Sequence, residues 1–343
     1  MRSFASDNNS SVHPEILNAV IQSNKDHAVG YGDDALTKQA EETIKSAFGV
    51  ECDVFFVLNG TGANSVALQA VTHSFDCIIA TQTAHICVDE CGAPTKMSGC
   101  RIMEVQSCDG KITPELIQTK LVGQGVVHHS QPRVVYISQV TELGTVYTLD
   151  EVRAIAELLH QNNMYLHMDG ARIANACAYL GCSLKEATVD VGVDILSFGG
   201  TKNGMMMGEA IISFDPELSK NIGYYRKQSA QLASKMRYLS AQFIPYIEQN
   251  IWLENATLAN QKALKLAEIL KQYPAVSFTQ KVESNALFLT LDRKIVDQLL
   301  EKYYFYFWNE AESEIRLVTS WDTTDEDIEQ FSLTLAKACK AVG

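Results

Sequence analysis

The sequence lacks any long hydrophobic run. Apolar residues make up 46% of its 343 positions, yet its uninterrupted apolar runs are short, as at 54–58 (VFFVL). A transmembrane helix needs about 20 predominantly apolar residues, so the sequence predicts no membrane span. The N-terminal stretch MRSFASDN contains no apolar segment and predicts no secretory signal. We therefore expect a cytoplasmic protein.

Blocks of basic residues are also absent. The chain has 28 Lys and Arg against 41 Asp and Glu, which gives a formal charge of −13. Without a basic run, neither nucleic acid nor an anionic membrane is an expected partner. Prolines number only seven, and no Pro- or Gly-rich linker divides the chain. A chain of this length is expected to form one large and one smaller domain, and without a linker the two should pack closely.

Paired cysteines are the third missing feature. The nine cysteines, an odd number, include no C-x-x-C pair, and several fall inside expected strands or helices, as reduced thiols do. Cys87 and Cys91 near His85 form the one cluster with metal-like spacing. Because no second Cys or His pair completes four ligands, we expect no metal site.

The sequence does contain a regular alternation of β-branched runs and helical stretches, between about residues 50 and 215. The runs predicted as strands are 54–58, 77–81, 101–106, 134–139, 165–169, 194–198 and 210–214. This alternation is typical of an α/β fold with a mainly parallel sheet covered by helices.

The C-terminal part has a different pattern. Helical periodicity over 217–272 predicts a connection to a second domain. Strands expected at 286–291 and 315–319, with a closing helix from Asp325, suit a small α+β domain. We predict three parts: an N-terminal segment 1–50 that packs with the small domain or a neighbouring subunit, a large cofactor-binding domain 51–250, and a small C-terminal domain 251–343.

Two residues follow predicted strands in positions that suit a pyridoxal phosphate site. Lys202 lies in the small-residue turn 197–204 (SFGGTKNG), where the backbone can bend tightly and present one amine. Asp169 closes the predicted strand 165–169. In enzymes with this cofactor a lysine holds the aldehyde and a carboxylate pairs with the ring nitrogen. Alone, Lys202 could be a solvated loop lysine and Asp169 a helix N-cap, but their combination favours the cofactor.

The turn 59–65 (NGTGANS) joins a predicted strand to an apolar helix. Free N–H groups at the helix N-terminus and the Thr61 hydroxyl could bind one phosphate group. A tight βα turn without a ligand fits the same residues, and the motif is neither G-x-G-x-x-G nor a P-loop. His85 follows the strand 77–81, where its imidazole could stack on a pyridine ring or simply bond to backbone. His167 lies inside a predicted strand and is interpreted as structural.

These residues resemble those of the low-specificity L-threonine aldolases, which are fold type I pyridoxal-phosphate enzymes. The resemblance covers almost the whole chain. Its motifs are 5–8 (ASDN), 31–34 (YGDD), 59–64 (NGTGAN), His85 with 89–93 (DECGA), 167–172 (HMDGAR), 198–204 (FGGTKNG) and Arg316.

The resemblance implies a fold like that of aspartate aminotransferase and a role for each motif. Lys202 would form the Schiff base with pyridoxal 5'-phosphate, Asp169 would pair with the pyridine nitrogen, and His85 would stack on the ring. Gly60 and Thr61 would bind the phosphate. The amino acid carboxylate would be held by Ser6, Arg172 and Arg316, since guanidinium groups match carboxylates. Arg172 would bind the cofactor as well.

Family tetramers share each active site between two subunits, which implies a homotetramer. A basic residue of the neighbouring subunit would then reach the phosphate, from the set Lys227, Lys235 and Arg237. A solvated helix face explains the same three residues.

The implied activity is aldol cleavage of L-threonine, L-allo-threonine and related β-hydroxy-α-amino acids to glycine and an aldehyde. A β-eliminating or other pyridoxal-phosphate lyase on the same fold is an alternative, as is a non-catalytic ligand-binding protein. One motif departs from the family pattern. Several members carry a histidine after the central strand, whereas this chain has 138–145 (SQVTELGT). The base for the β-hydroxyl is therefore open, with His85 or a water as candidates.

Overall fold

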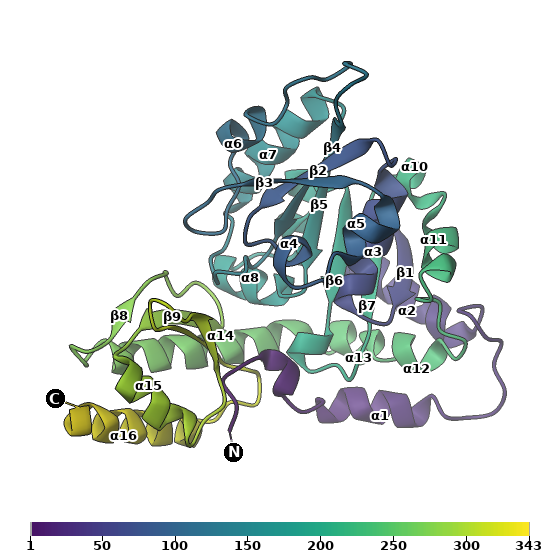
Figure 1. Ribbon diagram of the computed structural model, residues 1–343. Coiled ribbons are helices and arrows are strands. Elements are labelled where there is room, and N and C mark those ends of the chain that lie inside the picture. The colour runs from purple at the N-terminus through teal and green to yellow at the C-terminus, as the bar shows by residue number, and fades with distance from the viewer. Residues whose placement is uncertain (1, 343) are drawn as a thin grey trace.

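The computed structural model describes residues 2–342, and its largest element is a seven-stranded sheet (Figure 1). Its strands are β1 (Asp53–Val57), β2 (Asp76–Thr81), β3 (Arg101–Val105), β4 (Gln131–Ser138), β5 (Tyr165–Gly170), β6 (Ile195–Gly199) and β7 (Glu209–Ser213). Their order is β1-β7-β6-β5-β4-β2-β3. β7 runs antiparallel to β1 and β6, and the other neighbouring pairs are parallel. The predicted mainly parallel sheet is confirmed.

Helices cover both faces of this sheet and extend into the rest of the chain (Figure 1). The α-helices are α1 (Pro14–Gln22), α2 (Ala35–Phe48), α3 (Gly60–Val71), α4 (His85–Val88), α5 (Ala93–Ser98), α6 (Pro114–Gln118), α7 (Leu149–Gln161), α8 (Ile173–Leu180), α9 (Leu184–Ala187), α10 (Pro216–Ser219), α11 (Ile222–Gln228), α12 (Arg237–Ser240), α13 (Phe243–Glu248), α14 (Ile251–Leu270), α15 (Arg293–Leu300) and α16 (Asp325–Val342). The short 3-10 helices are η1 (Asp7–Asn9), η2 (Val189–Val191) and η3 (Thr201–Asn203).

Successive strand residues enter two separate hydrophobic cores, because side chains of a strand alternate between its faces. Val135 and Leu196 pack in a core with residues of α2, α7, α8 and α13. Val134 and Ile195, one position away, pack in another core with residues of α3, α10 and α11. The sheet is therefore buried on both faces.

The C-terminal part forms a four-stranded antiparallel sheet of order β10-β11-β9-β8. Its strands are β8 (Ser277–Phe278), β9 (Ala286–Thr290), β10 (Tyr306–Asn309) and β11 (Glu314–Val318). The two predicted strands correspond to β9 and β11, and the closing helix to α16. α14 joins the domains: Trp252 and Ala256 belong to a core of the large sheet, whereas Leu266 and Leu270 belong to the core of the small one.

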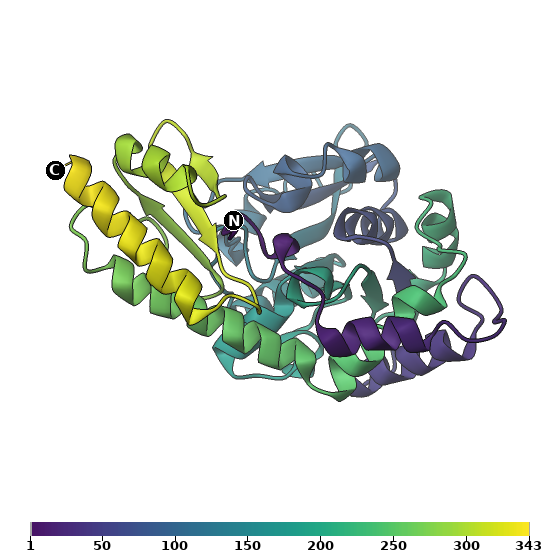
Figure 2. The same ribbon diagram turned by 90° about the horizontal axis from the view of Figure 1, so that it is seen from below.

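The first residues of the chain run between the two domains (Figure 2). The Phe4 N–H donates to the Tyr304 carbonyl, and the Val318 N–H donates to the Phe4 carbonyl, each at 2.8 Å. The Phe4 ring is fully buried in the core of the small domain, 5.2 Å from the Phe331 ring. Further on, the His13 N–H donates to the Gly204 carbonyl of the large domain at 2.8 Å. This segment thus forms hydrogen bonds with both domains and connects them.

None of the helices within residues 2–342 is long and apolar enough to cross a membrane.

We expect Phe4→Ala to lower the free energy of unfolding by about 3–5 kcal/mol, since it leaves a cavity in the small core. The midpoint of urea unfolding, followed by circular dichroism, measures this loss. Leu333→Ala on α16 is the control, because Leu333 is 54% exposed and its truncation should change stability by no more than about 0.5 kcal/mol. Equal midpoints for the two variants would contradict the role of Phe4.

Candidate active site

The residues predicted for the site lie together at one edge of the large sheet. Since β2, β5 and β6 point the same way, their carboxyl ends meet at that edge, where open α/β sheets bind ligands. His85 follows β2, Asp169 lies near the end of β5, and Lys202 follows β6. These three side chains line one small cavity of about 50 Å³ together with Gly60 and Arg172.

A larger cavity adjoins the small one. It has a volume of about 610 Å³ and shares His85, Glu142, Arg172 and Lys202 with the small cavity. Other residues of its lining are Ser6, Asn8, Asn9, Asp89, Tyr306, Phe307, Trp308 and Arg316. The N-terminal segment, the large domain and the small domain all contribute to this wall, so the space lies where the three meet.

Lys202 sits in a tight turn immediately after β6. The turn ends at Gly204, whose φ of 100° favours glycine, and a Cβ there would lie 2.6 Å from the amide nitrogen of Asn255. Burial and the nearby charge of Arg172 lower the pKa of the Lys202 amine. A lower pKa leaves more of the amine neutral, which is the form that attacks an aldehyde.

Asp169 is held as an anion by its neighbours. Its Oδ2 accepts hydrogen bonds from the Tyr136 hydroxyl at 2.6 Å and from the Asn64 amide at 2.8 Å, and its Oδ1 accepts the Ala171 N–H at 2.9 Å. Burial by itself would raise the pKa of Asp169, but these bonds and the charge of Lys202 outweigh it and the pKa lies below its usual value.

His85 begins α4 and is linked to Asp169 through a chain of polar groups. Its Nδ1 lies 2.7 Å from Oε1 of Glu90, and the Asn64 amide donates to both Glu90 and Asp169 at 2.8 Å. Burial lowers the pKa of His85, but the bond to Glu90 and the charge of Asp169 reverse this, so the pKa is raised. The raised pKa shifts the His85 ring toward its protonated form.

The turn predicted to bind phosphate is the N-terminus of α3. The Asn59 side chain caps the helix by accepting the Gly62 N–H at 2.8 Å. Gly60 lines the small cavity, and no atom lies within 4 Å of the position where its Cβ would be. Thr61 belongs to the same first turn but is not among the residues that line either cavity. The first turn of a helix offers N–H groups and a positive dipole end to an anion.

Arg172 and Ser6 both line the larger cavity. Nε and Nη2 of Arg172 donate to the two carboxylate oxygens of Asp7 at 2.7 and 2.8 Å. The Asn285 amide donates to the same carboxylate at 3.0 Å, and the Ser6 hydroxyl accepts the Asn8 N–H at 3.2 Å. Within residues 2–342, Nη1 of Arg172 makes no hydrogen bond. This nitrogen is therefore available to a ligand.

Arg316 enters the larger cavity from β11. Its Nη2 donates to the Ala5 carbonyl at 3.2 Å, while its Nε is buried without a hydrogen-bond partner. The guanidinium carbon lies 5.9 and 5.5 Å from the ring centres of Tyr306 and Trp308. Burial and the charge of Arg172 lower the pKa of Arg316. Two partly buried guanidinium groups beside one cavity would attract a carboxylate, which could accept hydrogen bonds from their unpaired N–H groups.

The three basic residues considered for a neighbouring subunit lie apart from these cavities. Lys227 stands over the Tyr31 ring at 4.9 Å, and Arg237 donates to the Lys25 carbonyl at 3.0 Å. Lys235 lines a separate cavity of about 330 Å³. Their role toward a second subunit stays a prediction.

Several residues of the site were not predicted from the sequence, because the sequence pattern around them only weakly indicates a functional role. Asn64 lies in the motif 59–64 and Glu90 in the motif 89–93, but neither was assigned a role from the sequence, because their hydrogen-bond partners belong to other elements. Tyr136 points from the middle of β4 onto Asp169. Glu142 was detectable as a carboxylate in a loop that follows a strand, and Asp7 as part of the N-terminal motif.

Glu209 is another buried acid that the sequence did not single out. It lies on β7 behind the Lys202 turn, and a Cβ on Gly199 would lie 2.7 Å from its Oε2. Burial raises the pKa of Glu209 to about 7, even though hydrogen bonding to Thr201 and the charge of Lys202 act in the opposite direction.

The donor set fits pyridoxal phosphate. The Lys202 amine, the Asp169 carboxylate, the His85 imidazole and Gly60 at the start of α3 border one cavity. The carboxylate is held ionised for the ring nitrogen, and the lowered pKa of the amine favours the neutral form that attacks an aldehyde. Residues 2–342 contain no group of three His, Cys, Asp or Glu side chains arranged to hold a metal ion. His167 is fully buried 3.0 Å from the Ser197 hydroxyl, and burial lowers its pKa to about 4, so it stays neutral.

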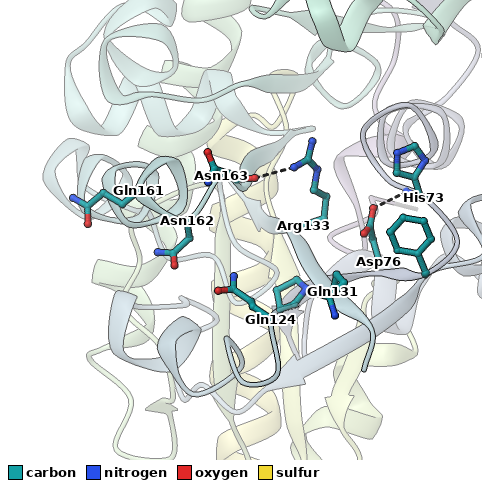
Figure 3. A pocket seen from close by; sticks show the side chains of 10 residues that line it. His73, Asp76, Gln124, Gln131, Arg133, Gln161, Asn162 and Asn163 are labelled. Carbon is teal, nitrogen blue, oxygen red and sulfur yellow. Dashed lines mark hydrogen bonds between the residues drawn. The ribbon is translucent and has the colours of Figure 1, made fainter. Parts of the chain in front are cut away.

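A cavity of about 580 Å³ lies at the opposite ends of β2 and β4 (Figure 3). Asp76 accepts the His73 N–H at 2.7 Å, and Arg133 donates to the Asn163 carbonyl at 2.9 Å. These lining groups are already bonded within the protein. The cavity contains none of the residues predicted for the site.

Comparisons with known proteins agree with this geometry. A family model described as beta-eliminating lyase matches residues 3–293. The low specificity L-threonine aldolase of Pseudomonas aeruginosa is 42% identical over 330 residues, which cover 96% of this chain and 95% of the relative. That of a Pseudomonas sp. strain is 40% identical over 339 residues, or 98% of each chain.

Solved structures show the same likeness. Leishmania major threonine aldolase superposes with a TM-score of 0.92 at 29% identity, over 98% of this chain and 99% of the other. An alanine–glyoxylate aminotransferase from Nostoc sp. gives 0.72 at 14% identity, over 98% and 95% of the two chains, which shows the fold alone. The predicted fold type I architecture is confirmed.

Glu209→Gln should stabilise the protein more at alkaline than at acidic pH. The unfolded glutamate loses its proton near 4.5 but the folded one only near about 7, so wild-type stability falls as the pH rises through that window. At pH values above this window, the wild type carries a buried ionised carboxylate at position 209, whereas the variant has a neutral amide there. Urea midpoints at about pH 5 and about pH 8 measure the difference. Exposed Glu157→Gln is the control, and the same stability difference at both pH values would refute the prediction.

Proposed function

The chain belongs to the beta-eliminating lyase family and, within it, to the low-specificity L-threonine aldolases, and on this premise we propose that it cleaves L-threonine, L-allo-threonine and related β-hydroxy-α-amino acids to glycine and an aldehyde. Enzymes of this family and fold class depend on pyridoxal phosphate. The observation that carries the proposal is the meeting of Lys202, Asp169, Arg172 and Arg316 around two adjoining cavities.

Each of these residues would have a separate task. The Lys202 amine would hold the cofactor's aldehyde, and Asp169 would keep a proton on the ring nitrogen. The first turn of α3, with Gly60 and Thr61, would bind the phosphate, and His85 would lie against the ring. Bound pyridoxal phosphate supplies a sink for the electrons of the bond broken at the substrate Cα.

Two arginine side chains would determine which substrate bond is broken, because they would fix the orientation of the substrate. Nη1 of Arg172 and the guanidinium of Arg316 would hold the substrate carboxylate, with the Ser6 hydroxyl beside them. Fixing the carboxylate fixes the rotation about the bond to Cα, and the bond held in the reactive orientation is the one that cleaves. The larger cavity, of about 610 Å³, leaves space for different β-substituents.

We also propose a cytoplasmic homotetramer with active sites at a subunit interface. Cysteines throughout the described chain are free, as in a reducing compartment. Ile21, Val29 and Tyr31 are 60%, 66% and 53% exposed within one short stretch, and exposed apolar groups of this kind support a subunit contact. Light scattering after size-exclusion chromatography would give four times the 37.9 kDa chain mass if the proposal is right.

Lys202→Ala is expected to abolish aldehyde release. The purified protein is mixed with pyridoxal phosphate and each threonine diastereomer, while absorption, glycine and acetaldehyde are measured together. Loss of the bound-cofactor band and of cleavage is expected, because no other amine replaces Lys202. Lys271→Ala, at an exposed ion pair of α14, is the control that should keep both.

Two other outcomes are decisive. Unchanged cleavage by Lys202→Ala would overturn the assignment of the lysine. Release of ammonia and a keto acid in place of glycine and an aldehyde would show that the wild-type enzyme is a β-eliminating lyase, which is the reaction that gives its family model its description.

A further inference from the structure

Aldol cleavage needs a group that accepts the proton of the substrate β-hydroxyl. Besides Lys202, whose amine is assigned to the cofactor, three side chains around the larger cavity can accept a proton: His85, Asp89 and Glu142. The ring of His85 is bonded at Nδ1 to the buried carboxylate of Glu90, which favours its protonated form. Asp89 is exposed to solvent and lines only the larger cavity.

Glu142 occupies a different position. It lines both cavities, so its carboxylate borders the place of the cofactor and the space left for the β-substituent. Its Oε1 accepts the Ser138 hydroxyl at 2.6 Å and the His85 N–H at 2.8 Å. Within residues 2–342, Oε2 receives no hydrogen bond. One oxygen is thus fixed by the protein, and the other is available to a ligand.

Hydrogen bonds and packing hold the turn that carries Glu142 in place. The Gly144 N–H donates to the Thr141 carbonyl at 2.9 Å, and the hydroxyls of Thr141 and Thr145 lie 2.7 Å apart. Leu143 packs against Phe288 in a cluster that joins the turn to the small domain. A general base must be held within hydrogen-bonding reach of its proton, and this turn provides such a fixed position.

We propose that Glu142 is the catalytic base that accepts the β-hydroxyl proton of the substrate, an inference that rests on the proposed aldolase function. The O–H bond breaks and its proton moves to Oε2 of Glu142. The electron pair left on oxygen forms the C=O bond of the aldehyde as the Cα–Cβ bond breaks. The pair of that bond stays with Cα, which later takes up one proton to give glycine, so the net reaction consumes no proton.

Protonation of Glu142 should then control the rate. Burial raises the pKa of Glu142 despite hydrogen bonds from Ser138 and the His85 backbone, which brings it nearer the working pH of a base. Charged groups around the same cavities are His85, Asp89, Asp169, Arg172, Lys202 and Arg316. Because the base must be ionised, kcat/KM should fall as the pH falls through this pKa.

The test compares Glu142→Gln with the wild type in two reactions. Cleavage of L-allo-threonine needs the base, and its kcat/KM should fall by about 10²- to 10⁴-fold with loss of the acid limb of the pH profile. Exchange of a glycine Cα proton for deuterium, followed by proton NMR, involves no hydroxyl and should be unchanged. Pyridoxal phosphate affinity, from fluorescence titration of the apoprotein, should also be unchanged.

Two further variants complete the experiment. Glu142→Asp keeps a carboxylate and should recover part of the cleavage rate together with the acid limb. Glu283→Gln makes the same chemical change at a side chain that accepts the Val146 N–H at 2.8 Å from the far side of the loop. It should behave as wild type in both reactions.

The outcomes separate the two proposals. Wild-type protein that exchanges glycine but cleaves no β-hydroxy amino acid would refute the aldolase function, and the role of Glu142 with it. Wild-type cleavage matched by Glu142→Gln would refute the role of Glu142 alone. So would a parallel loss of cleavage, exchange and cofactor affinity, because Glu142 would then support the site's structure instead of accepting a proton.

Discussion

Mutual compensation of buried charges at the carboxyl edge of the sheet is the constraint on which the site depends. A charge removed from water is costly unless it is paired or hydrogen-bonded. Asp7 is paired with Arg172 through two bonds, and Asp169 receives three donors while Lys202 lies nearby. Each functional charge therefore requires polar neighbours on other strands and helices, which explains why so much of the edge is polar in an otherwise apolar sheet.

The same compensation connects the domains. The Asp7 carboxylate, from the N-terminal segment, binds Arg172 of the large domain and Asn285 of the small one. Leu143 makes a second connection, since it packs on the small domain next to Glu142. Cavity-lining groups from both domains are thus fixed relative to one another by contacts that lie beside the cavity. The same contacts therefore position the residues of the site and hold the two domains together.

The sequence predicts those parts of this arrangement that depend on local patterns. Lys202 and Asp169 could be found because apolar runs precede them, and the strands because their apolar residues are contiguous. The reversed direction of β7 has no local signal, and β8 is too short to show one. Partners through space, such as Tyr136 on Asp169, could not be predicted, because hydrogen bonds between separate elements leave no spacing in the chain.

The N-terminal segment has a consequence for synthesis of the protein. Phe4 pairs with Tyr304 and Val318, and Asp7 with Asn285. These partners are synthesised long after Phe4 and Asp7, so both residues remain without these contacts until the small domain has been made. The wall of the larger cavity that the N-terminal segment shares with the small domain can therefore form only after that part of the chain is available.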